Sequence, residues 1–306
     1  MATAPTRARK APAPASPSEA PSEAPAPTRP VRPPPFIIES QQEILRWLNL
    51  LIYGDYGVGK THLAGTSADV PQMRDVILIN AEAGDLTLSG KEYSFPLIDS
   101  IRVNDYATVA RVYDFLKVHC KYRDANDTDK LRDLEARLRG VDAKKIKKPR
   151  MYRTVLIDSG TEVESYCMNA LLGITDATKM DEEMASAEWG EYKRNLNMVK
   201  RMVRNFRDLP MHVIMTCAQR WVQDEAKKFN YHPAMTGQLS DAVQGFMDMV
   251  GYYITSGTSE EGKTNRRLYV APTGRFKAKC RISGFKGTHF DNPVMKDITK
   301  AIGLLK

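Results

Sequence analysis

The sequence lacks long apolar runs and contains few cysteines and histidines. Its 306 residues include four cysteines and five histidines. No apolar stretch approaches the roughly 20 residues of a membrane-spanning helix, so we expect no membrane partner and a cytoplasmic location. The cysteines stand far apart without a CxxC pair, which argues against a zinc ribbon and a disulfide framework. They are Cys120, Cys167, Cys217 and Cys280.

Proline is distributed unevenly along the chain. Residues 1–35 contain 11 of the 18 prolines, and most of the remaining positions are Ala, Ser, Thr, Glu and Arg. Such a segment cannot bury enough apolar surface to offset its ordering entropy, so we expect a disordered tail that could tether a partner. A targeting peptide is the alternative, but this proline density prevents the amphipathic helix that it needs. The folded domain is expected over residues 36–306.

Charge is concentrated in particular segments of the folded domain. The net charge of +8 is compatible with a polyanionic partner but does not require one. Residues 121–150 are highly charged around an apolar seam, and we interpret them as a helical insertion on the surface. Because charge runs are usually solvated faces, this insertion carries no functional prediction.

Short apolar runs alternate with helix-like segments through most of the domain. Continuously apolar runs separated by helices indicate a parallel sheet covered on both faces. The last three runs follow one another closely, which predicts antiparallel strands added at one edge. The runs are 48–54, 75–81, 152–159, 211–218, 249–256, 266–272 and 276–283. A helix is also predicted over 189–206, because its apolar residues recur every three or four positions and form one face for packing on the sheet.

A glycine-rich stretch follows the first apolar run. Residues 54–61, GDYGVGKT, fit the pattern G-x-x-x-x-G-K-[ST] between a strand and a helix. In this context backbone N–H groups surround phosphates, Lys60 neutralises the β- and γ-phosphates, and Thr61 binds Mg²⁺. A glycine-rich turn with a surface lysine is the alternative, but the flanking pattern favours a nucleoside triphosphate site. The expected nucleotide-binding residues are Gly54, Asp55, Tyr56, Gly57, Val58, Gly59, Lys60, Thr61 and His62.

Acidic residues at strand ends are the candidates for metal binding and water activation. Asp158 ends the run TVLID, and ligands of open α/β sheets gather at the carboxyl ends of strands. We therefore expect Thr61 and Asp158 to hold the metal, although an aspartate there can also cap the next helix. Glu82 is the preferred candidate for the residue that activates water. Glu162 remains open, since acidic residues are favoured in a first helical turn for other reasons.

The order of these motifs resembles that of RecA-like recombinases. ILINAEAGDL at 77–86 is similar to the segment that carries their catalytic glutamate, and HVIMTCAQR at 212–220 is similar to the strand that ends in their γ-phosphate sensor. Within that superfamily the chain most resembles phage-encoded RecA-like ATPases of single-strand annealing systems, also described as phage AAA-type nucleotide-binding proteins. This resemblance rests on WGEY at 189–192, TGQLSDAV at 236–243 and RFKAKCR at 275–281, and covers roughly residues 45–285.

The resemblance implies a RecA-like α/β core with ATP and Mg²⁺ as cofactors. It also implies recombination on single-stranded DNA by a homo-oligomer with ATP between subunits, in the cytoplasm of a bacterial host. A single-strand-binding protein is a further candidate partner. By position, Lys60 and Glu82 would be catalytic, and Gln219 would report the γ-phosphate to a DNA-binding loop. The acidic segment 174–188 departs from this picture, because negative charge does not favour DNA where the first DNA loop is expected.

Two basic segments offer further candidates. In RFKAKCRIS, 275–283, cations alternate with apolar residues, so a strand would carry four cations on one face. Lys279 or Arg281 could reach a neighbouring subunit's nucleotide as an arginine finger, whereas outward charges on an edge strand could simply prevent aggregation. The loop after Gln219 mixes aromatic and basic residues, as single-strand binding requires. Its candidate DNA-binding residues are Arg220, Trp221, Lys227, Lys228, Phe229 and Tyr231.

Two functions from different classes follow. The first is an ATPase that binds single strands and promotes annealing or strand exchange. The second is a nucleotide-dependent switch or loader that remodels a replication protein such as a helicase. The basic elements and the aromatic loop favour the first function, and the acidic segment favours the second. A small-molecule kinase is disfavoured, because no acceptor site or lid is recognisable.

Overall fold

The structure is a computed structural model that describes residues 47–184, 186–223, 227–258, 262–283 and 285–304. The predicted proline-rich tail, residues 1–35, therefore lies outside the described residues. Within the described part, strands and helices alternate along the chain as far as the middle of the domain. The positions of the functional side chains follow from where each strand and helix begins and ends.

A mixed sheet of ten strands forms the centre of the molecule. Its main order is β10-β8-β7-β1-β5-β4-β2-β3, and the strands from β7 to β3 run parallel. β8 and β10 add antiparallel strands at one edge, while β6 pairs with the end of β5 and β9 with the start of β7. This arrangement confirms the predicted α/β class. The strands are β1 (Asn49–Gly54), β2 (Val76–Asn80), β3 (Ile98–Arg102), β4 (Thr154–Asp158), β5 (His212–Gln223), β6 (Phe229–Pro233), β7 (Met249–Thr258), β8 (Thr264–Tyr269), β9 (Lys279–Cys280) and β10 (His289–Asp291).

Helices connect the parallel strands and cover the sheet. The α-helices are α1 (Lys60–Gly65), α2 (Tyr106–Asp124), α3 (Thr128–Arg139), α4 (Gly160–Leu171), α5 (Trp189–Arg207), α6 (Leu239–Phe246) and α7 (Met295–Ala301). The short 3-10 helices are η1 (Thr66–Asp69), η2 (Gly84–Leu88), η3 (Phe95–Leu97) and η4 (Ala143–Lys145). Within the described ranges, no helix is both long enough and apolar enough to cross a membrane.

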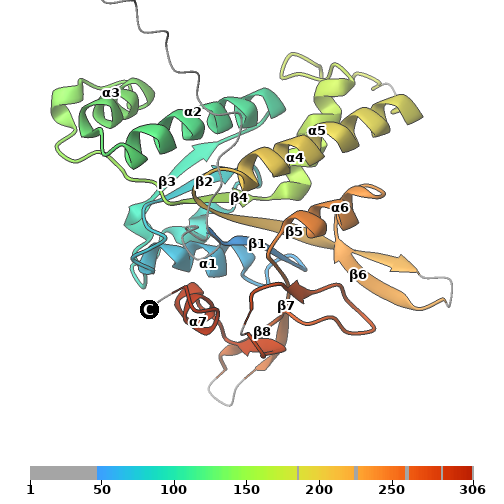
Figure 1. Cartoon of the computed structure of the whole chain (residues 1–306). Coiled ribbons are helices and arrows are strands. Elements are labelled where there is room, and N and C mark those ends of the chain that lie inside the picture. The colour runs from blue at the N-terminus through green and yellow to red at the C-terminus, as the bar shows by residue number, and fades with distance from the viewer. Residues whose placement is uncertain (1–46, 185, 224–226, 259–261, 284, 305–306) are drawn as a thin grey trace, which may run out of the picture. The chain divides into compact units, whose positions relative to one another are not determined.

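Successive residues of a strand point to opposite faces of the sheet. Helices cover both faces, so both are buried. Leu51 and Val213 pack on one face with α2, α4, α5 and α6, whereas their neighbours Leu50 and Ile214 pack on the other face with α1 and α7. Figure 1 shows these two helical layers on either side of the strands. Strands buried on both faces read as continuous apolar runs, which explains the sequence pattern.

The predicted helix over 189–206 forms, but only its second half packs on the sheet. Val199, Val203 and Phe206 are buried, as the apolar periodicity predicts. Trp189 and Tyr192 belong to the same stripe but are 82% and 43% exposed. The predicted sheet-facing stripe is therefore wrong for these two aromatic residues.

The predicted strand over 276–283 is much shorter in the structure. Of this segment, only Lys279 and Cys280, which form β9, pair with β7, and the residues before them run beside β6 instead. The Tyr231 N–H donates to the Arg275 carbonyl over 2.8 Å, and the Lys277 N–H donates to the Tyr231 carbonyl over 3.3 Å. The expected alternation persists, since Ala278 is buried while Lys277 and Arg281 are exposed.

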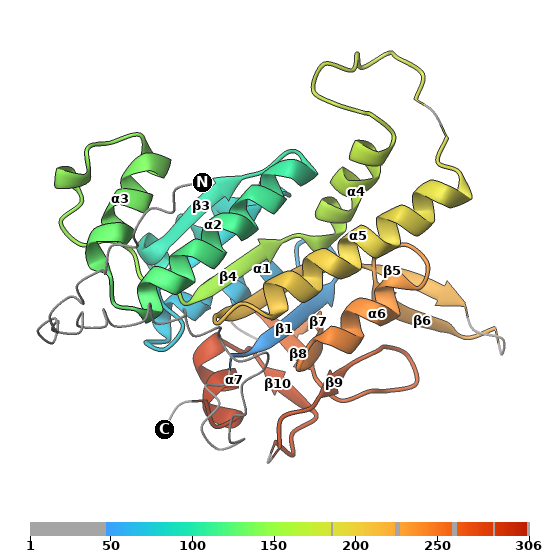
Figure 2. The same cartoon turned by 45° about the horizontal axis from the view of Figure 1, so that its top comes forward.

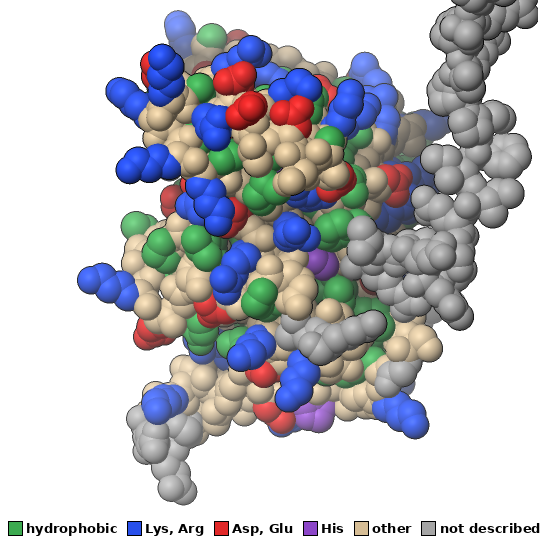
Figure 3. Space-filling model, turned by 60° about the vertical axis from the view of Figure 1, so that its left-hand side comes forward, with side chains coloured by type: hydrophobic (Ala, Val, Ile, Leu, Met, Phe, Trp, Pro, Cys, Tyr) green, Lys and Arg blue, Asp and Glu red, His purple; other side chains and the backbone are tan. Residues whose placement is uncertain are grey.

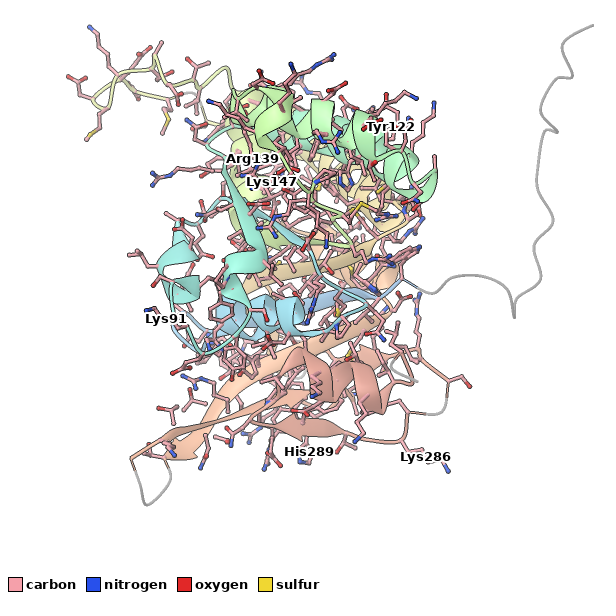
Figure 4. All side chains as sticks on the ribbon, turned by 90° about the vertical axis from the view of Figure 1, so that its left-hand side faces the viewer. Lys91, Tyr122, Arg139, Lys147, Lys286 and His289 are labelled. Atoms are coloured by element: carbon pink, nitrogen blue, oxygen red, sulfur yellow. The ribbon has the colours of Figure 1, made fainter. Side chains whose placement is uncertain are left out.

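The charged segment 121–150 comprises the last turn of α2, α3 and η4. Helix α3 packs on α2, with Leu131 buried, whereas Leu138 and Val141 of the predicted seam are exposed. Arg139, which is labelled in Figure 4, contacts the Asp99 carboxylate of β3 at 2.8 Å. Basic and acidic side chains are interspersed over this part of the surface in Figure 3.

Close packing between β7 and β8 yields a stability prediction. A Cβ added at Gly251 would lie 2.5 Å from Leu268 Cδ1, and Leu268 is fully buried. We expect Gly251→Ala to lower the free energy of unfolding by about 1–3 kcal/mol, as overpacking does. Gly245→Ala in α6 is the control, since nothing lies within 4 Å of its Cβ. Urea unfolding measures both variants, and equal stabilities would contradict the prediction.

Candidate nucleotide-binding site

The loop between β1 and α1 has the backbone shape of a phosphate cradle. Gly57 and Gly59 have φ values of 71° and 92°, in the left-handed region that favours glycine. Gly54 lies so close to β7 that a Cβ there would stand 2.1 Å from the Tyr253 carbonyl oxygen. The glycines of GDYGVGKT thus meet three separate steric requirements, and Gly59 leads directly into α1.

Lys60 is held inside this loop. Its side chain is only 7% exposed, and Nζ donates to the carbonyls of Gly54 over 3.2 Å and Asp55 over 2.8 Å. Burial lowers the pKa of Lys60, while the nearby carboxylates of Glu82 and Asp158 oppose that shift. The ammonium group is therefore positioned with few solvent contacts where phosphate oxygens would replace backbone carbonyls as its partners.

Asp158 stands opposite the loop at the carboxyl end of β4. Its Oδ2 accepts a hydrogen bond of 2.7 Å from the Thr61 hydroxyl, and its Oδ1 accepts one from the Thr216 hydroxyl of β5. Ser159, not Asp158, caps α4, because its hydroxyl accepts the Glu162 N–H at 3.4 Å. The structure thus brings together the two predicted metal residues, and adds Thr216, which no sequence motif marked.

The residues around Asp158 fit a magnesium ion. Thr61 and Asp158 supply a hydroxyl and a carboxylate, and Mg²⁺ prefers such oxygen ligands together with substrate phosphates. Gly84 leaves room there, since a Cβ would lie 3.4 Å from Asp158 Oδ2 and 3.6 Å from Thr61 Oγ1. Thr61 and Asp158 would hold the ion, and Thr216 would orient the carboxylate.

Glu82 lies beside this pair. The N–H groups of Ala81 and Glu82 donate to the Asp158 carbonyl over 2.7 and 3.1 Å, which fixes the chain where β2 ends. Burial first, and then the charge of Asp158, raises the pKa of the Glu82 carboxyl. Glu82 lines the same cavity of about 460 Å³ as Lys60 and Thr61, whereas Glu162 lines the adjoining one.

Arg266, Tyr253 and His62 also line the cavity, and of these three the sequence pointed only to His62. Arg266 of β8 donates from Nε to the Val58 carbonyl over 2.9 Å, and Tyr253 lines the wall beside it. His62, predicted from the motif, lies edge-on to Tyr93 at 5.2 Å between ring centroids, and burial lowers the pKa of its imidazole. Arg266 escaped prediction because no sequence pattern shows that β8 returns next to the loop.

The predicted γ-phosphate sensor and DNA loop lie on a hairpin of β5 and β6. Gln219 does not line the cavity around Lys60; its Oε1 accepts a hydrogen bond of 2.9 Å from the Tyr252 hydroxyl. Beyond it, Trp221 packs edge-on against Tyr231 and Phe229, with centroids 5.2 and 5.9 Å apart. Trp221 and Phe229 are 62% and 54% exposed, whereas Tyr231 is half-buried. Lys227 and Lys228 are exposed at the turn, and Arg220 donates to the Gly237 carbonyl.

Lys279 and Arg281 lie at the opposite end of the sheet. Lys279 pairs with Val250, whose other neighbour in β1 is Leu51, and the Arg281 N–H donates to the Asp248 carbonyl over 2.9 Å. These positions are near the start of β1, whereas the phosphate loop follows its end. Neither side chain lines this chain's own nucleotide cavity.

Thr216 generates a prediction for metal-dependent binding. Thr216→Val removes the hydroxyl that orients Asp158 while keeping the side-chain shape. We expect affinity for a fluorescent nucleotide in the presence of Mg²⁺ to fall about tenfold, as for other outer-shell partners. Thr154→Val is the control, because its buried hydroxyl donates to Met73 at the far end of β4. Mg²⁺ titrations measure both, and equal losses would rule out an orienting role for Thr216.

Comparison with family models identifies the family of this chain. A family model described as an AAA domain matches residues 46–282. Comparison with curated proteins gave no match. Among solved structures, the flagellar accessory protein FlaH from Methanocaldococcus jannaschii is 11% identical, with a TM-score of 0.39 over 80% of this chain and 84% of that one. The RadB recombinase is 14% identical, with a TM-score of 0.34 over 72% and 79% of the two chains.

A DnaB-like replicative helicase, solved with its interactions with primase, is also 14% identical, with a TM-score of 0.38 over 80% of this chain and 54% of that one. These structural similarities are distant. The family match, in contrast, spans most of the chain and includes every element of the site built around Lys60. The chain belongs to this AAA domain family, and the protein is a P-loop ATPase.

Proposed function

We propose that this ATPase binds single-stranded DNA and couples ATP hydrolysis to annealing or strand exchange. The observation that carries the proposal is the course of β5. Its first half lies in the central sheet and presents Thr216 to Asp158, and its second half forms the hairpin with Trp221. A change at the metal site can therefore reach an aromatic and basic surface through one continuous strand.

The nucleotide chemistry in this proposal follows from the positions described above. ATP would lie in the cavity with its phosphates at Lys60 and the loop N–H groups. Mg²⁺ at Thr61 and Asp158 would neutralise phosphate charge. Glu82 would accept a proton from the water that attacks the γ-phosphate in line, and positioning with charge neutralisation would supply most of the acceleration.

The raised pKa of Glu82 predicts the pH dependence of hydrolysis. Only the ionised carboxylate can act as a base, so activity is lost as pH falls through the raised pKa. We expect the acid limb of kcat/KM to lie above the pKa of about 4.3 for an ordinary glutamate. Glu82→Gln should lower kcat by about 10²- to 10⁴-fold. Glu162→Gln is the control, and a comparable loss there would assign the base to Glu162 instead.

The proposal includes a homo-oligomer with ATP between subunits. Because Lys279 and Arg281 do not line this chain's own cavity, a finger role for either residue would require a second subunit. The phage-encoded setting in a bacterial cytoplasm, and a single-strand-binding protein as additional partner, belong to the same proposal. Gln219 would act as sensor only after its hydrogen bond to Tyr252 rearranges.

The second candidate is a switch or loader that acts on a replication protein. The segment between α4 and α5 favours it, since Asp181, Glu182 and Glu183 are all exposed there. Negative charge repels a nucleic acid backbone but can recognise a basic protein surface. This segment follows α4, which begins directly after Asp158, so it too is connected to the metal site.

Salt dependence separates the two candidates. If the hairpin binds phosphates, single-stranded DNA should stimulate hydrolysis, and stimulation should fade as salt rises. Lys227→Gln with Lys228→Gln should lower the slope of log affinity against log salt by about 1.4, since each single-strand phosphate contact contributes about 0.7. Lys144→Gln with Lys145→Gln is the matched control on η4. Hydrolysis indifferent to DNA at low salt would overturn the proposal in favour of the protein partner.

A further inference from the structure

A second cavity adjoins the nucleotide cavity on the side of β8. We call it the β8 cavity; its volume is about 900 Å³, and residues 263–266 and 292–294 line it together with His62, Tyr93 and Tyr253. His62, Tyr253 and Arg266 also line the nucleotide cavity, so the two cavities meet at these side chains. Figure 2 shows β8 and β10 at this edge of the sheet, beyond β7 and β1.

The lining of the β8 cavity suits a nucleoside. Tyr93 and Tyr253 contribute rings, and His62 lies edge-on to Tyr93 with centroids 5.2 Å apart. Asn265 and Asn292 add uncharged amides beside them. Aromatic side chains stack on bases of any sequence, and a few polar groups then orient a ligand among rings. A base and its sugar therefore have suitable partners here.

The positions of Lys60 and Glu82 indicate which end of a nucleotide would face the β8 cavity. The loop motif assigns the β- and γ-phosphates to Lys60. Glu82 lines the nucleotide cavity and, together with Glu162, a different adjoining cavity. With the γ-phosphate facing Glu82, the nucleoside points away from Glu82 and toward the β8 cavity. The α-phosphate then lies where the two cavities meet.

Arg266 is fixed at this junction by the strands around it. It pairs with Thr255 of β7, its N–H donates to Asn292 Oδ1 over 2.7 Å, and its carbonyl accepts the Asn292 N–H over 2.7 Å. Its Nε donates to the Val58 carbonyl over 2.9 Å and would lie 3.3 Å from a Cβ at Gly59. The fold itself thus places the guanidinium against the phosphate loop, as a binding site requires.

The guanidinium of Arg266 is available to an anion. Among the described residues no carboxylate forms an ion pair with it, whereas Arg267, the next residue of β8, pairs with Asp291 over 2.6 Å. A guanidinium carries five N–H donors, and the bond to Val58 uses one of them. Arg266 is partly exposed and lines both cavities, so a ligand can reach it. Arginine recognises phosphate oxygens through such donors.

We infer that Arg266 is a second phosphate-binding cation of this ATPase, and that it contacts the α-phosphate of a nucleotide whose nucleoside lies in the β8 cavity. Arg266 acts within its own chain, in contrast to the finger role proposed for Lys279 or Arg281. The inference rests on the position of Glu82 in the proposed function and does not require DNA binding. Lys60 holds the β- and γ-phosphates, while Arg266 ties the nucleotide to β8.

Nucleotide affinities test the inference on the full chain. Competition against a fluorescent ATP analogue, with Mg²⁺ present, would measure ATP and ADP on each variant. We expect Arg266→Gln to weaken both nucleotides by the same factor, about 10- to 100-fold, because each loses a hydrogen bond between charged groups. Arg266→Lys keeps the charge and should recover part of the affinity. A loss confined to ATP would place Arg266 at the γ-phosphate and overturn the inference, as would unchanged affinities.

Arg267→Gln is the matched control on the same strand. Arg267 lines neither cavity, so this variant should leave both affinities unchanged. Thermal unfolding without nucleotide checks that each variant folds, and Arg266→Lys replaces Arg266→Gln in the comparison if the latter does not. Equal losses in Arg267→Gln and Arg266→Gln would mean that the strand, and not a phosphate contact, sets the affinity.

Sulfur substitution identifies the phosphate that Arg266 contacts. Replacing a non-bridging α-oxygen of ADP by sulfur should weaken binding to the unmodified protein in at least one diastereomer, because sulfur is a poorer hydrogen-bond acceptor. Arg266→Gln should remove this α-sulfur effect and keep the effect of a β-sulfur. Loss of the β-sulfur effect instead would mean that Arg266 only shapes the loop. That result, or the absence of any α-sulfur effect, would overturn the inference.

Kinetics separate this inference from the proposed function. A contact with the α-phosphate is the same in the ground and transition states, so Arg266→Gln should raise KM and leave kcat nearly unchanged. A fall in kcat without a change in KM would overturn the inference while the Glu82 prediction stands. Full kcat in Glu82→Gln would instead overturn the proposed chemistry, whatever the affinities of the Arg266 variants.

Discussion

The carboxylate of Asp158 is the point on which the arrangement of this protein depends. Its two oxygens accept hydrogen bonds from Thr61, at the start of α1, and from Thr216, in β5. The backbone carbonyl of Asp158 accepts hydrogen bonds from the N–H groups of Ala81 and Glu82, where β2 ends. One residue thus joins three segments that are far apart in the sequence. Because neighbouring parallel strands end at the same edge of the sheet, their terminal side chains converge without any loop reaching across.

Burial determines the electrostatics of this edge. Desolvation is the largest influence on the pKa of both Lys60 and Glu82, and the carboxylate of Asp158 raises the pKa of both groups. Charges in such surroundings are costly unless they are paired. A triphosphate with its metal would supply partners of both signs, so its binding would relieve a cost already present in the fold. This is the preorganisation on which phosphoryl transfer relies.

Two routes lead from Asp158 to one surface. β5 carries Thr216 at the metal site and Trp221 on the hairpin, and α4 begins directly after β4 and carries Glu164. The routes meet again where Glu164 holds the Thr236 N–H and where Arg220 lines the same cavity as Glu164. A shift of either element at the nucleotide site would therefore also move residues at this surface.

The sequence determined the sheet, its two covered faces and the nucleotide loop. Continuous apolar runs, the glycine positions and the order of Lys60, Glu82 and Asp158 are local signals, each explained by sterics or by strand periodicity. Tertiary structure alone decided which polar groups meet across strands. Thr216 and Arg266 sit in stretches that read only as strands, and they became site residues because β5 and β8 pass beside the loop.

Two sequence patterns gave wrong predictions for the same reason, because neither pattern shows how the elements pack in the tertiary structure. Helical periodicity placed Trp189 and Tyr192 on the sheet-facing side of α5, but periodicity does not tell which turns of a helix are covered by neighbouring elements. The alternation over 276–283 was correct as a pattern, yet hydrogen bonds to Tyr231 divert its first residues away from β7. Sequence fixes which side chains share a face, while only the packed chain decides what that face meets.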